Sequence, residues 1–433
     1  NARTHQAKTN IFGHIAATAR KSAQYLERFI KHQKNIIDLL RVDPKPLKNI
    51  EESLKENEAL IAYLPVGAGI YVFIAQQGRI QFVNIPFDHK ACRSALAHLC
   101  SAPPQSGEYS RAEERVKHMV GLIANSIQIY IADKKYIGLV PFDYLSYLPL
   151  EISVGSKSDE RQVFYLNNMS SYKYLKSKRK IYKNKFCAVG PLEGFRGAEL
   201  FKGSRHVPLN STKGVLGHEE YDIIQFNNTV RLEHAVPVFS TVLTNVDGGS
   251  DGREVPRYSM VGEVSGNKSG IRGFDWFNMK QRLYLAVFTG TSFEKECLLG
   301  HGPDSFLPIE EALFLQGCPS ILVQRFAMPA EIKAELLNLF YQNLKDHNKA
   351  VALQRSACSI LEKYNSIRYA YAFILKGYPG LSNEEILSEV SSLCQRSERQ
   401  GRLAYANKNW DDVIYYYNLF LKLAGSTGSI DYI

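Results

Sequence analysis

The chain has 433 residues, of which 45% are hydrophobic, 22% charged and 11% aromatic. These values are typical of a globular protein with a large core, and they exclude disordered, collagenous and disulfide-stapled chains. The seven cysteines form no CxxC pair, so we predict neither a disulfide framework nor a zinc site. A net charge of +10 is compatible with an acidic or nucleic-acid partner. The chain does not open on a signal-peptide pattern, and we expect a cytoplasmic protein.

The first part of the chain predicts helices followed by strands. Apolar residues at helical spacing predict a helix over 10–41, and a second, shorter helix is expected over 46–57. Residues 59–78 carry no charge, but a proline and two glycines interrupt them, so they predict strand, turn and strand rather than a membrane span. Residues 70–85 form two β-rich runs around a QQGR turn, which is the pattern of a hairpin.

The next hundred residues predict two helices and two strands. Helices are expected over 89–100 and 111–125. The run IQIYIA (127–132) is almost wholly apolar and predicts a buried strand. A short strand, YIGLV, then precedes the segment PFDYL (141–145).

The second half of the chain alternates short apolar strands with helices. The strands are expected at 186–190, 221–226, 283–288 and 320–326. The helices are expected over about 308–316, 330–345 and 348–363. This alternation predicts a mostly parallel sheet covered by helices on both faces.

A basic segment lies between the two halves. Residues 170–186 hold no acidic residue and seven basic ones, Lys173, Lys176, Lys178, Arg179, Lys180, Lys183 and Lys185. Tyr172, Tyr174 and Tyr182 interleave with these cations, a composition that suits phosphate contacts and base stacking. The alternative is a solvated linker between the two halves of the fold.

The chain ends in a predicted helical tail from about residue 381. Residues 401–423 show the small–aromatic spacing of one helical-pair repeat. One face of the last helix is expected to carry Trp410, Val413, Tyr416 and Phe420. A single repeat cannot bury such a face alone, so we predict that it docks on the body of the protein or on a partner.

The order of these elements resembles the CHAT domain, a caspase-like, clan CD cysteine peptidase domain often joined to tetratricopeptide repeats. The resemblance spans about residues 46–380. It rests on IQIYIADKKYIGLVPFDYL (127–145), on the Gly-rich loop, helix and strand within 300–357, and on SIRYAYAFILKGYPG (366–380). The tail is similar to a tetratricopeptide repeat.

The resemblance implies a catalytic pair that this sequence lacks. CHAT peptidases carry a His in an H-x-A-T-H-G motif and a Cys in an L-S-A-C-E-T-G motif, each at a strand end. The thiolate attacks the peptide carbonyl and the imidazole transfers the proton. Here the two positions fall on Thr229 and Phe288, and neither 225–231 nor 284–292 contains a His or a Cys. We therefore predict a pseudopeptidase.

Other sequence features offer little chemistry. Cys297 and His301 share one loop and would be the pair of a relocated catalytic dyad, while Cys318 is expected to lie in the core. Phosphate-binding loops and metal-binding motifs are absent from the sequence, so we predict no cofactor, no metal and no small-molecule substrate.

The sequence thus predicts an α/β protein with four parts. A helical segment (1–45) precedes a smaller caspase-like half (46–180), a larger caspase-like half (181–380) and the helical tail (381–433). We expect a non-enzymatic scaffold or regulatory subunit with a protein partner, and the resemblance implies a bacterial defence or signalling assembly. The alternatives are an active cysteine peptidase with a relocated dyad and a nucleic-acid-associated protein that uses the basic segment.

Overall fold

The computed structural model describes most of the chain from residue 50 onward. The described residues are 50–155, 161–169, 171–177, 185–189, 200–201, 204–207, 221–226, 259–260, 271–272, 283–289, 313–314, 317–380 and 383–426. The helix predicted over 10–41 lies outside these residues, as does most of the helix predicted over 308–316. The helix predicted over 46–57 is largely wrong, because among its described residues, 50–57, only Ile50 and Glu51 are helical and turns follow.

The fold begins with a three-stranded meander. Strands β1 (Glu58–Val66), β2 (Gly69–Gln76) and β3 (Arg79–Pro86) pair antiparallel in chain order. Both turns contain a glycine with positive φ, Gly67 at 58° and Gly78 at 70°, a conformation that costs other residues energy. The strand–turn–strand and hairpin predictions are therefore confirmed.

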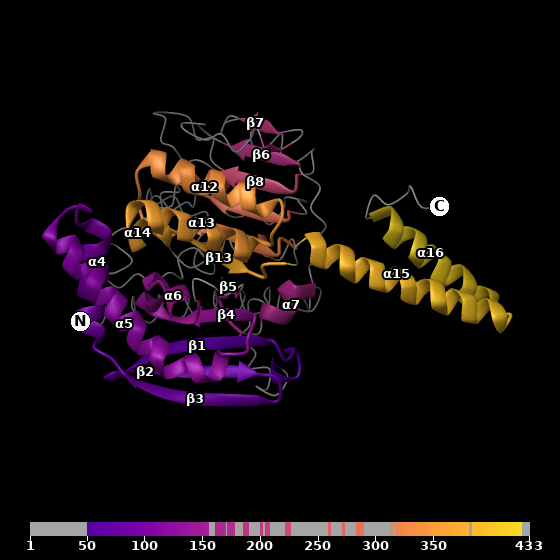
Figure 1. Cartoon of the computed structure of the whole chain (residues 1–433), viewed down its shortest axis with the longest axis horizontal. Coiled ribbons are helices and arrows are strands. Elements are labelled where there is room, and N and C mark those ends of the chain that lie inside the picture. Colours follow the sequence, from indigo (N-terminus) through magenta and orange to yellow (C-terminus); the bar gives the residue numbers. More distant parts are fainter. Residues whose placement is uncertain are drawn as a thin grey trace, which may run out of the picture.

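Two helices cover one face of this meander, and the longer one corrects a prediction. Helix α4 (His89–Ser101) is followed by α5 (Gly107–Ile131), which crosses β1–β3 in Figure 1. The predicted strand at 127–132 is wrong, because these residues form the last turns of α5. Because every residue in this run but one is apolar, its helical periodicity is not visible in the sequence. In the structure Ile127 and Ile131 are buried, whereas Ile129 is 76% exposed.

Five short elements complete the N-terminal half. Strand β4 (Tyr136–Pro141) pairs parallel with β1, and β5 (Gln162–Tyr165) pairs parallel with β4. A 3-10 turn (Asp143–Tyr147), helix α6 (Glu151–Val154) and helix α7 (Ser171–Ser177) surround them. The short strand predicted at YIGLV is confirmed.

The larger half supplies the remaining strands of one sheet. Its strands are β6 (Phe186–Val189), β7 (Arg205–Val207), β8 (Ile223–Phe226), β11 (Leu285–Phe288), β12 (Ser320–Gln324) and β13 (Phe373–Gly377). The sheet has 11 strands in the order β3-β2-β1-β4-β5-β13-β12-β11-β8-β6-β7. All neighbours except β3–β2, β2–β1 and β12–β13 are parallel, which confirms the predicted mostly parallel sheet. A separate pair, β9 (Ser259–Met260) and β10 (Ile271–Arg272), is antiparallel.

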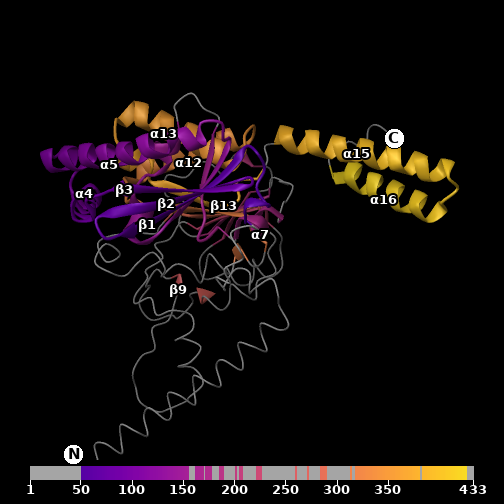
Figure 2. The same cartoon turned by 90° about the horizontal axis from the view of Figure 1, so that it is seen from below.

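Helices lie on both faces of the sheet, as predicted. Helices α12 (Ala330–Leu344), α13 (Lys349–Tyr364) and α14 (Ile367–Ala370) cover the face that α4 and α5 cover in the first half (Figure 2). Phe164 of β5 points to the opposite face, where its ring stacks on Tyr172 of α7 at 5.8 Å. Among the described helices, none is long and apolar enough to cross a membrane.

The two halves meet at a buried ion pair. Arg325, just after β12, is bound to the carboxylate of Glu151 on α6 and donates to Tyr165 Oη at 3.2 Å. It also donates to the carbonyl of Tyr371 at 2.8 Å and to the carbonyl of Leu148 at 3.3 Å. Burial by itself would lower the pKa of this guanidinium, but the Glu151 carboxylate raises it above its ordinary value. The charge is therefore held in the interior by a complete set of acceptors.

We expect the change Arg325→Met to lower the free energy of unfolding by about 3–5 kcal/mol, because it leaves the Glu151 carboxylate buried without its cation. The double change Arg325→Met with Glu151→Leu should recover part of this loss. Denaturant unfolding measures both effects. The matched control is Arg93→Met, whose exposed partner Asp143 lies 2.6 Å away and which should cost less than about 1 kcal/mol. Equal losses in Arg325→Met and Arg93→Met would contradict the central role of the buried pair.

Candidate functional site

The carboxyl ends of two central strands meet where the resemblance places a catalytic pair. Strands β8 and β11 pair parallel, with Phe226 in register with Phe288. This parallel pairing places the two strand ends side by side. Thr229, the position that corresponds to the family's His, lies outside the described residues.

Two stacked phenylalanines fill these strand ends. The rings of Phe226 and Phe288 lie 5.1 Å apart at an interplanar angle of 14°. Phe226 is 1% exposed and Phe288 is 4% exposed, so both rings belong to the hydrophobic core. A phenyl ring has neither a nucleophile nor a titratable proton, and the stack occupies space beside the position where a thiol would stand.

Polar groups next to this stack form hydrogen bonds with backbone carbonyl groups. Thr289 is buried, and both its amide and its hydroxyl donate to the carbonyl of Phe226, at 3.0 and 3.1 Å. Lys333 on α12 donates to the carbonyl of Thr289 at 3.1 Å, and burial lowers the pKa of this lysine. About two turns further along α12, Tyr341 donates to Gln225 Oε1 at 2.7 Å. The sequence carried no motif that marks Lys333 or Tyr341.

A fully buried lysine lies under the start of the same strand. Lys349, the first residue of α13, is 0% exposed, and its Nζ donates to the carbonyl of Tyr284 at 3.0 Å. Its Nζ also lies 3.8 Å from the centre of the Tyr284 ring. Burial lowers the pKa of Lys349 from its ordinary 10.5 to about 7, and the nearby Cys318 opposes this shift. No sequence pattern marks this residue as buried, because a lysine at a helix start is usually solvated.

The buried Lys349 predicts a pH dependence of stability. Between pH 7 and 10.5 the folded chain holds fewer protons at this site than the unfolded chain, so stability should rise with pH by up to about 1.4 kcal/mol per unit. Below pH 7 the lysine is protonated in both states, and its contribution to the pH dependence ends. The change Lys349→Met should remove the slope and raise the melting temperature at pH 7. Lys363→Met, at a surface lysine paired with Glu335, is the control, and an unaltered slope in Lys349→Met would refute the assignment.

The cysteines of the described residues lack the setting of a nucleophile. Cys318 is buried, as predicted, and its thiol contacts the carbonyl of Ser320 at 3.1 Å. Burial raises the pKa of Cys92 to about 12. Cys297 and His301, the pair of a relocated dyad, lie outside the described residues.

The basic segment contributes to the core more than was predicted. Lys176 is not a free cation, because its Nζ binds both oxygens of the buried Glu58, at 2.5 and 2.7 Å. Tyr172 is 1% exposed and stacks on Phe164, so it is unavailable for base stacking. Lys173 and Lys185 are exposed. The remaining basic residues, Lys178, Arg179, Lys180 and Lys183, lie outside the described residues, and a nucleic-acid patch there stays a prediction.

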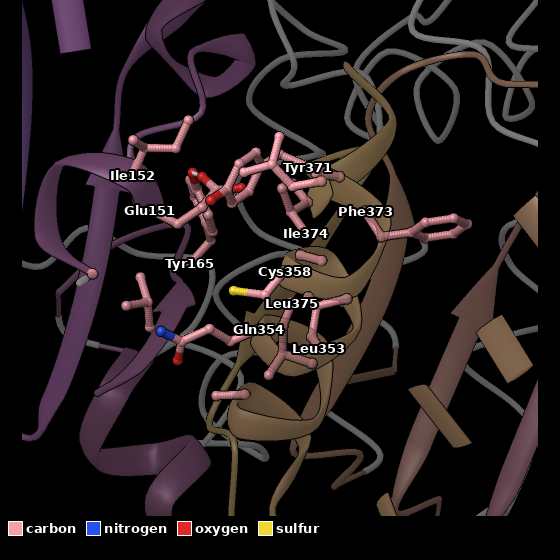
Figure 3. A pocket seen from close by; sticks show the side chains of 16 residues that line it. Glu151, Ile152, Tyr165, Leu353, Gln354, Cys358, Tyr371, Phe373, Ile374 and Leu375 are labelled. Carbon is pink, nitrogen blue, oxygen red and sulfur yellow. Dashed lines mark hydrogen bonds between the residues drawn. The ribbon is translucent and has the colours of Figure 1, made fainter. Parts of the chain in front are cut away.

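A cavity of about 190 Å3 lies on the seam between the two halves. Val163 and Tyr165 of β5 line one side, and Leu353, Gln354 and Cys358 of α13 line the other. Figure 3 shows Cys358 Sγ and the Gln354 amide pointing toward the N-terminal half, below the group formed by Glu151 and Tyr165. The described lining contains no histidine, so Cys358 has no imidazole base within this cavity.

The tail forms a helical hairpin that leaves the body of the molecule. Helices α15 (Asn383–Ala406) and α16 (Trp410–Ser426) pack on each other, and Figures 1 and 2 both show them extending away from the sheet. A Cβ on Gly401 would lie 3.0 Å from the ring of Tyr417, so the two helices approach closely there. The helical tail is thus confirmed, and its tetratricopeptide character stays a prediction.

The face predicted for docking is only partly as expected. Val413 and Tyr416 are half-buried, but Trp410 is 57% exposed and contacts Tyr405 at 5.6 Å between ring centres. The side chain of Phe420 lies outside the described residues. The other strongly exposed apolar side chains of the hairpin are Leu403, Tyr405, Ile414 and Tyr415. This hairpin therefore presents an aromatic surface to solvent instead of docking on the sheet.

The described residues hold no cluster of three or more His, Cys, Asp or Glu side chains that could bind a metal ion. The charged groups that lie inside the fold are engaged by one another or by backbone carbonyls, as Arg325, Glu58 and Lys349 show.

Comparison with known proteins agrees with this arrangement. Residues 271–377, which include β11, β12 and β13, match the model of the CHAT domain family. This stretch of the chain is similar to the CHAT domain. The resemblance predicted from the sequence is confirmed, although the family match covers less of the chain than the 46–380 that we expected.

Solved structures share the fold of this chain at low sequence identity. A crystal structure of the Saccharomyces cerevisiae separase–securin complex at 2.6 Å matches with a TM-score of 0.50 and 10% identity, over 77% of this chain and 31% of the matched chain. A second structure of that complex at 3.0 Å matches with a TM-score of 0.48 and 9% identity, over the same shares. The chain thus spans about a third of the matched chain, and the likeness concerns the fold. Comparison with curated protein sequences finds no significant match.

Proposed function

We propose that this CHAT protein is catalytically inactive and serves as a scaffold or regulatory subunit for another protein. The observation that carries the proposal is the Phe226–Phe288 stack, which fills the strand ends where the family resemblance expects a peptidase site. The absence of a His and a Cys from residues 225–231 and 284–292 supports it further. The separase of the similar structures is itself recorded in complex with another protein, securin.

The chemistry of a cysteine peptidase explains why this stack matters. The reaction needs a thiolate at one strand end and an imidazole close enough to exchange a proton with it. Phe288 stands where the thiolate would be, and its ring lies against Phe226 rather than against an open cleft. Restoring a thiol alone would leave it without a base and in apolar surroundings that raise its pKa.

The test is incubation of the chain with a library of unstructured peptides, read by mass spectrometry. We expect no cleavage by the wild type, and none by Phe288→Cys, because a single thiol without its base is a poor nucleophile. An electrophilic probe that labels peptidase thiolates should not react selectively with either protein.

The competing hypothesis is a peptidase that uses Cys297 and His301, and the same assay separates the two. Site-selective cleavage by the wild type that disappears in Cys297→Ser and in His301→Ala, but persists in the control Cys100→Ser, would overturn our proposal. Cys100 suits this control because it is a half-buried cysteine on α4, far along the sheet from β11.

The scaffold role requires a surface that binds a partner, and the tail hairpin supplies the aromatic candidate. Because Trp410 is 57% exposed, Trp410→Ala should change the free energy of unfolding by less than about 1.5 kcal/mol, the loss of one aromatic contact with Tyr405. A Trp buried against the body would instead cost about 3–5 kcal/mol. The melting temperature of Trp410→Ala, compared with that of the wild type, distinguishes the small loss of stability from the large one.

The partner-binding half of this test compares the proteins that co-purify with each variant. Trp410→Ala should lose a partner that the wild type retains, because exposed Trp residues are often the centres of binding energy at interfaces. Phe142→Ala is the matched control, since Phe142 is 45% exposed on the body of the protein. A Trp410→Ala variant that keeps both its stability and its partner would remove the tail from the scaffold role.

A further inference from the structure

The two edges of the 11-stranded sheet differ sharply. One edge is β7, three residues long, with exposed Arg205 and His206. The other edge is β3, whose eight residues all pair with β2, from Gly69 opposite Pro86 to Gln76 opposite Arg79. Short, charged edges resist the addition of another strand, whereas long regular edges invite it. Of these two edges, only β7 is both short and charged, and so protected against the addition of another strand.

Strand β3 lacks the features that usually block pairing. Its sequence, RIQFVNIP, has one charged residue, Arg79, at its first position and a proline only at its last. The register with β2 is continuous and has no bulge. Among the described residues, no strand pairs with its outer side, as its terminal place in the sheet shows (Figure 1). Within the described part of the chain, the outward N–H and C=O groups of β3 therefore have no strand partner.

An exposed aromatic side chain stands in the middle of this edge. Phe82 is 54% exposed, and its ring contacts Tyr71 at 5.2 Å and Phe73 at 5.3 Å. Leu64 and Val66 of β1, 37% and 36% exposed, lie on the same face of the meander, since Leu64 is opposite Tyr71. The edge thus combines unpaired backbone with an apolar face, which is the composition of a strand-addition site.

We propose that β3 is a homodimer interface, in which it pairs antiparallel with β3 of a second copy. A two-fold axis perpendicular to the sheet brings the two edges together and keeps the covered face of both sheets on the same side. Side chains opposite each other must then come from the same face, so a residue on β3 pairs with one an even number of positions away, or with itself. The strand is therefore its own complement, with no further segment required.

The side chains select one register. With Phe82 opposite Phe82 of the second copy, residues 79–85 all pair, and Pro86, which has no N–H to donate, falls outside the ladder. The aromatic cluster of Phe73 and Phe82 then continues across the axis into its counterpart. Arg79 lies opposite the aliphatic Ile85, so the two arginines stay apart. Shifting the centre to Val83 would place Phe82 opposite the polar Asn84 and bring Pro86 into the ladder.

The size of this interface sets its expected strength. One strand from each copy buries less surface than a permanent dimer needs, so we expect a weak dimer that dissociates at concentrations of about 1–100 µM. The inference is independent of whether the chain cleaves peptides, because β3 lies at the far end of the sheet from β8 and β11.

Sedimentation of the full chain over about 1–200 µM tests the proposal. The wild type should show a concentration-dependent dimer. Phe82→Lys should raise the dissociation constant at least about tenfold, because it opposes two like charges in the centre of the ladder. Phe142→Lys is the matched control, since it converts another half-exposed phenylalanine, which follows β4, three strands in from the β3 edge, and should dimerise as the wild type does.

Two further experiments report the register directly. Phe82→Lys and Phe82→Glu should each be monomeric alone, yet a mixture should form a heterodimer, because the new charges lie opposite each other. Phe82→Cys should form a disulfide-linked dimer on mild oxidation, whereas Phe142→Cys should not, since opposite residues of an antiparallel pair have Cα atoms about 4.5–5.5 Å apart.

Three outcomes would overturn the proposal. One is a wild type that stays monomeric at the highest concentration, which would leave the edge to a strand of a different protein. Another is equal weakening by Phe82→Lys and Phe142→Lys. The third is a mixture of Phe82→Lys and Phe82→Glu that remains monomeric although both variants keep the melting temperature of the wild type.

Discussion

The buried guanidinium of Arg325 is the interaction on which the architecture depends. Strands β5 and β13 join the two halves of the sheet through one register pair, Tyr165 opposite Lys376, so the backbone seam is thin. Arg325 strengthens it by binding Glu151 and Tyr165 of the first half and the carbonyl of Tyr371 of the second. A buried charge without this set of partners would cost several kcal/mol. Glu151 and Tyr165, two partners of Arg325, also line the seam cavity.

The sheet that this seam completes has the mostly parallel strand order of a caspase-like fold. Parallel pairing of β8 and β11 brings two strand ends together whatever residues occupy them, because the backbone ladder sets their separation. Here those ends carry Phe226 and Phe288, whose stacking adds to the core. Burial of this kind stabilises the strand ends. Under the proposed function it also removes the polar, accessible setting that acid–base chemistry needs, since a fold does not by itself imply an activity.

Surfaces suited to interaction lie at the extremities of the molecule rather than at its centre. The aromatic hairpin of α15 and α16 projects from one end of the body, and the β3 edge closes the sheet at another (Figure 1). A protein that self-associates through one surface and holds a partner through the other would present two copies of its partner site. Two linked sites bind a two-site target far more tightly than either alone, provided that the geometry allows both to engage. This combination fits a scaffold better than a solitary enzyme.

The sequence by itself determined most of the local structure, because each signal there is local. The hairpin turns needed glycines with positive φ, the C-terminal strands were short apolar runs between polar segments, and the helices of 330–364 had clear apolar periods. The strand predicted at 127–132 was wrong because an apolar stretch fits a strand or a buried helix equally well. The exposed side chain of Ile129 shows that this stretch is a helix with one face toward solvent. Of the candidate site, the sequence supplied the residues Phe288 and Thr229 but not the Phe226–Phe288 stack. Only the tertiary structure decided that Lys176 pairs with Glu58, that Lys349 is buried and that Arg325 joins the halves, since each depends on residues far apart in the chain that only packing brings within a few ångströms.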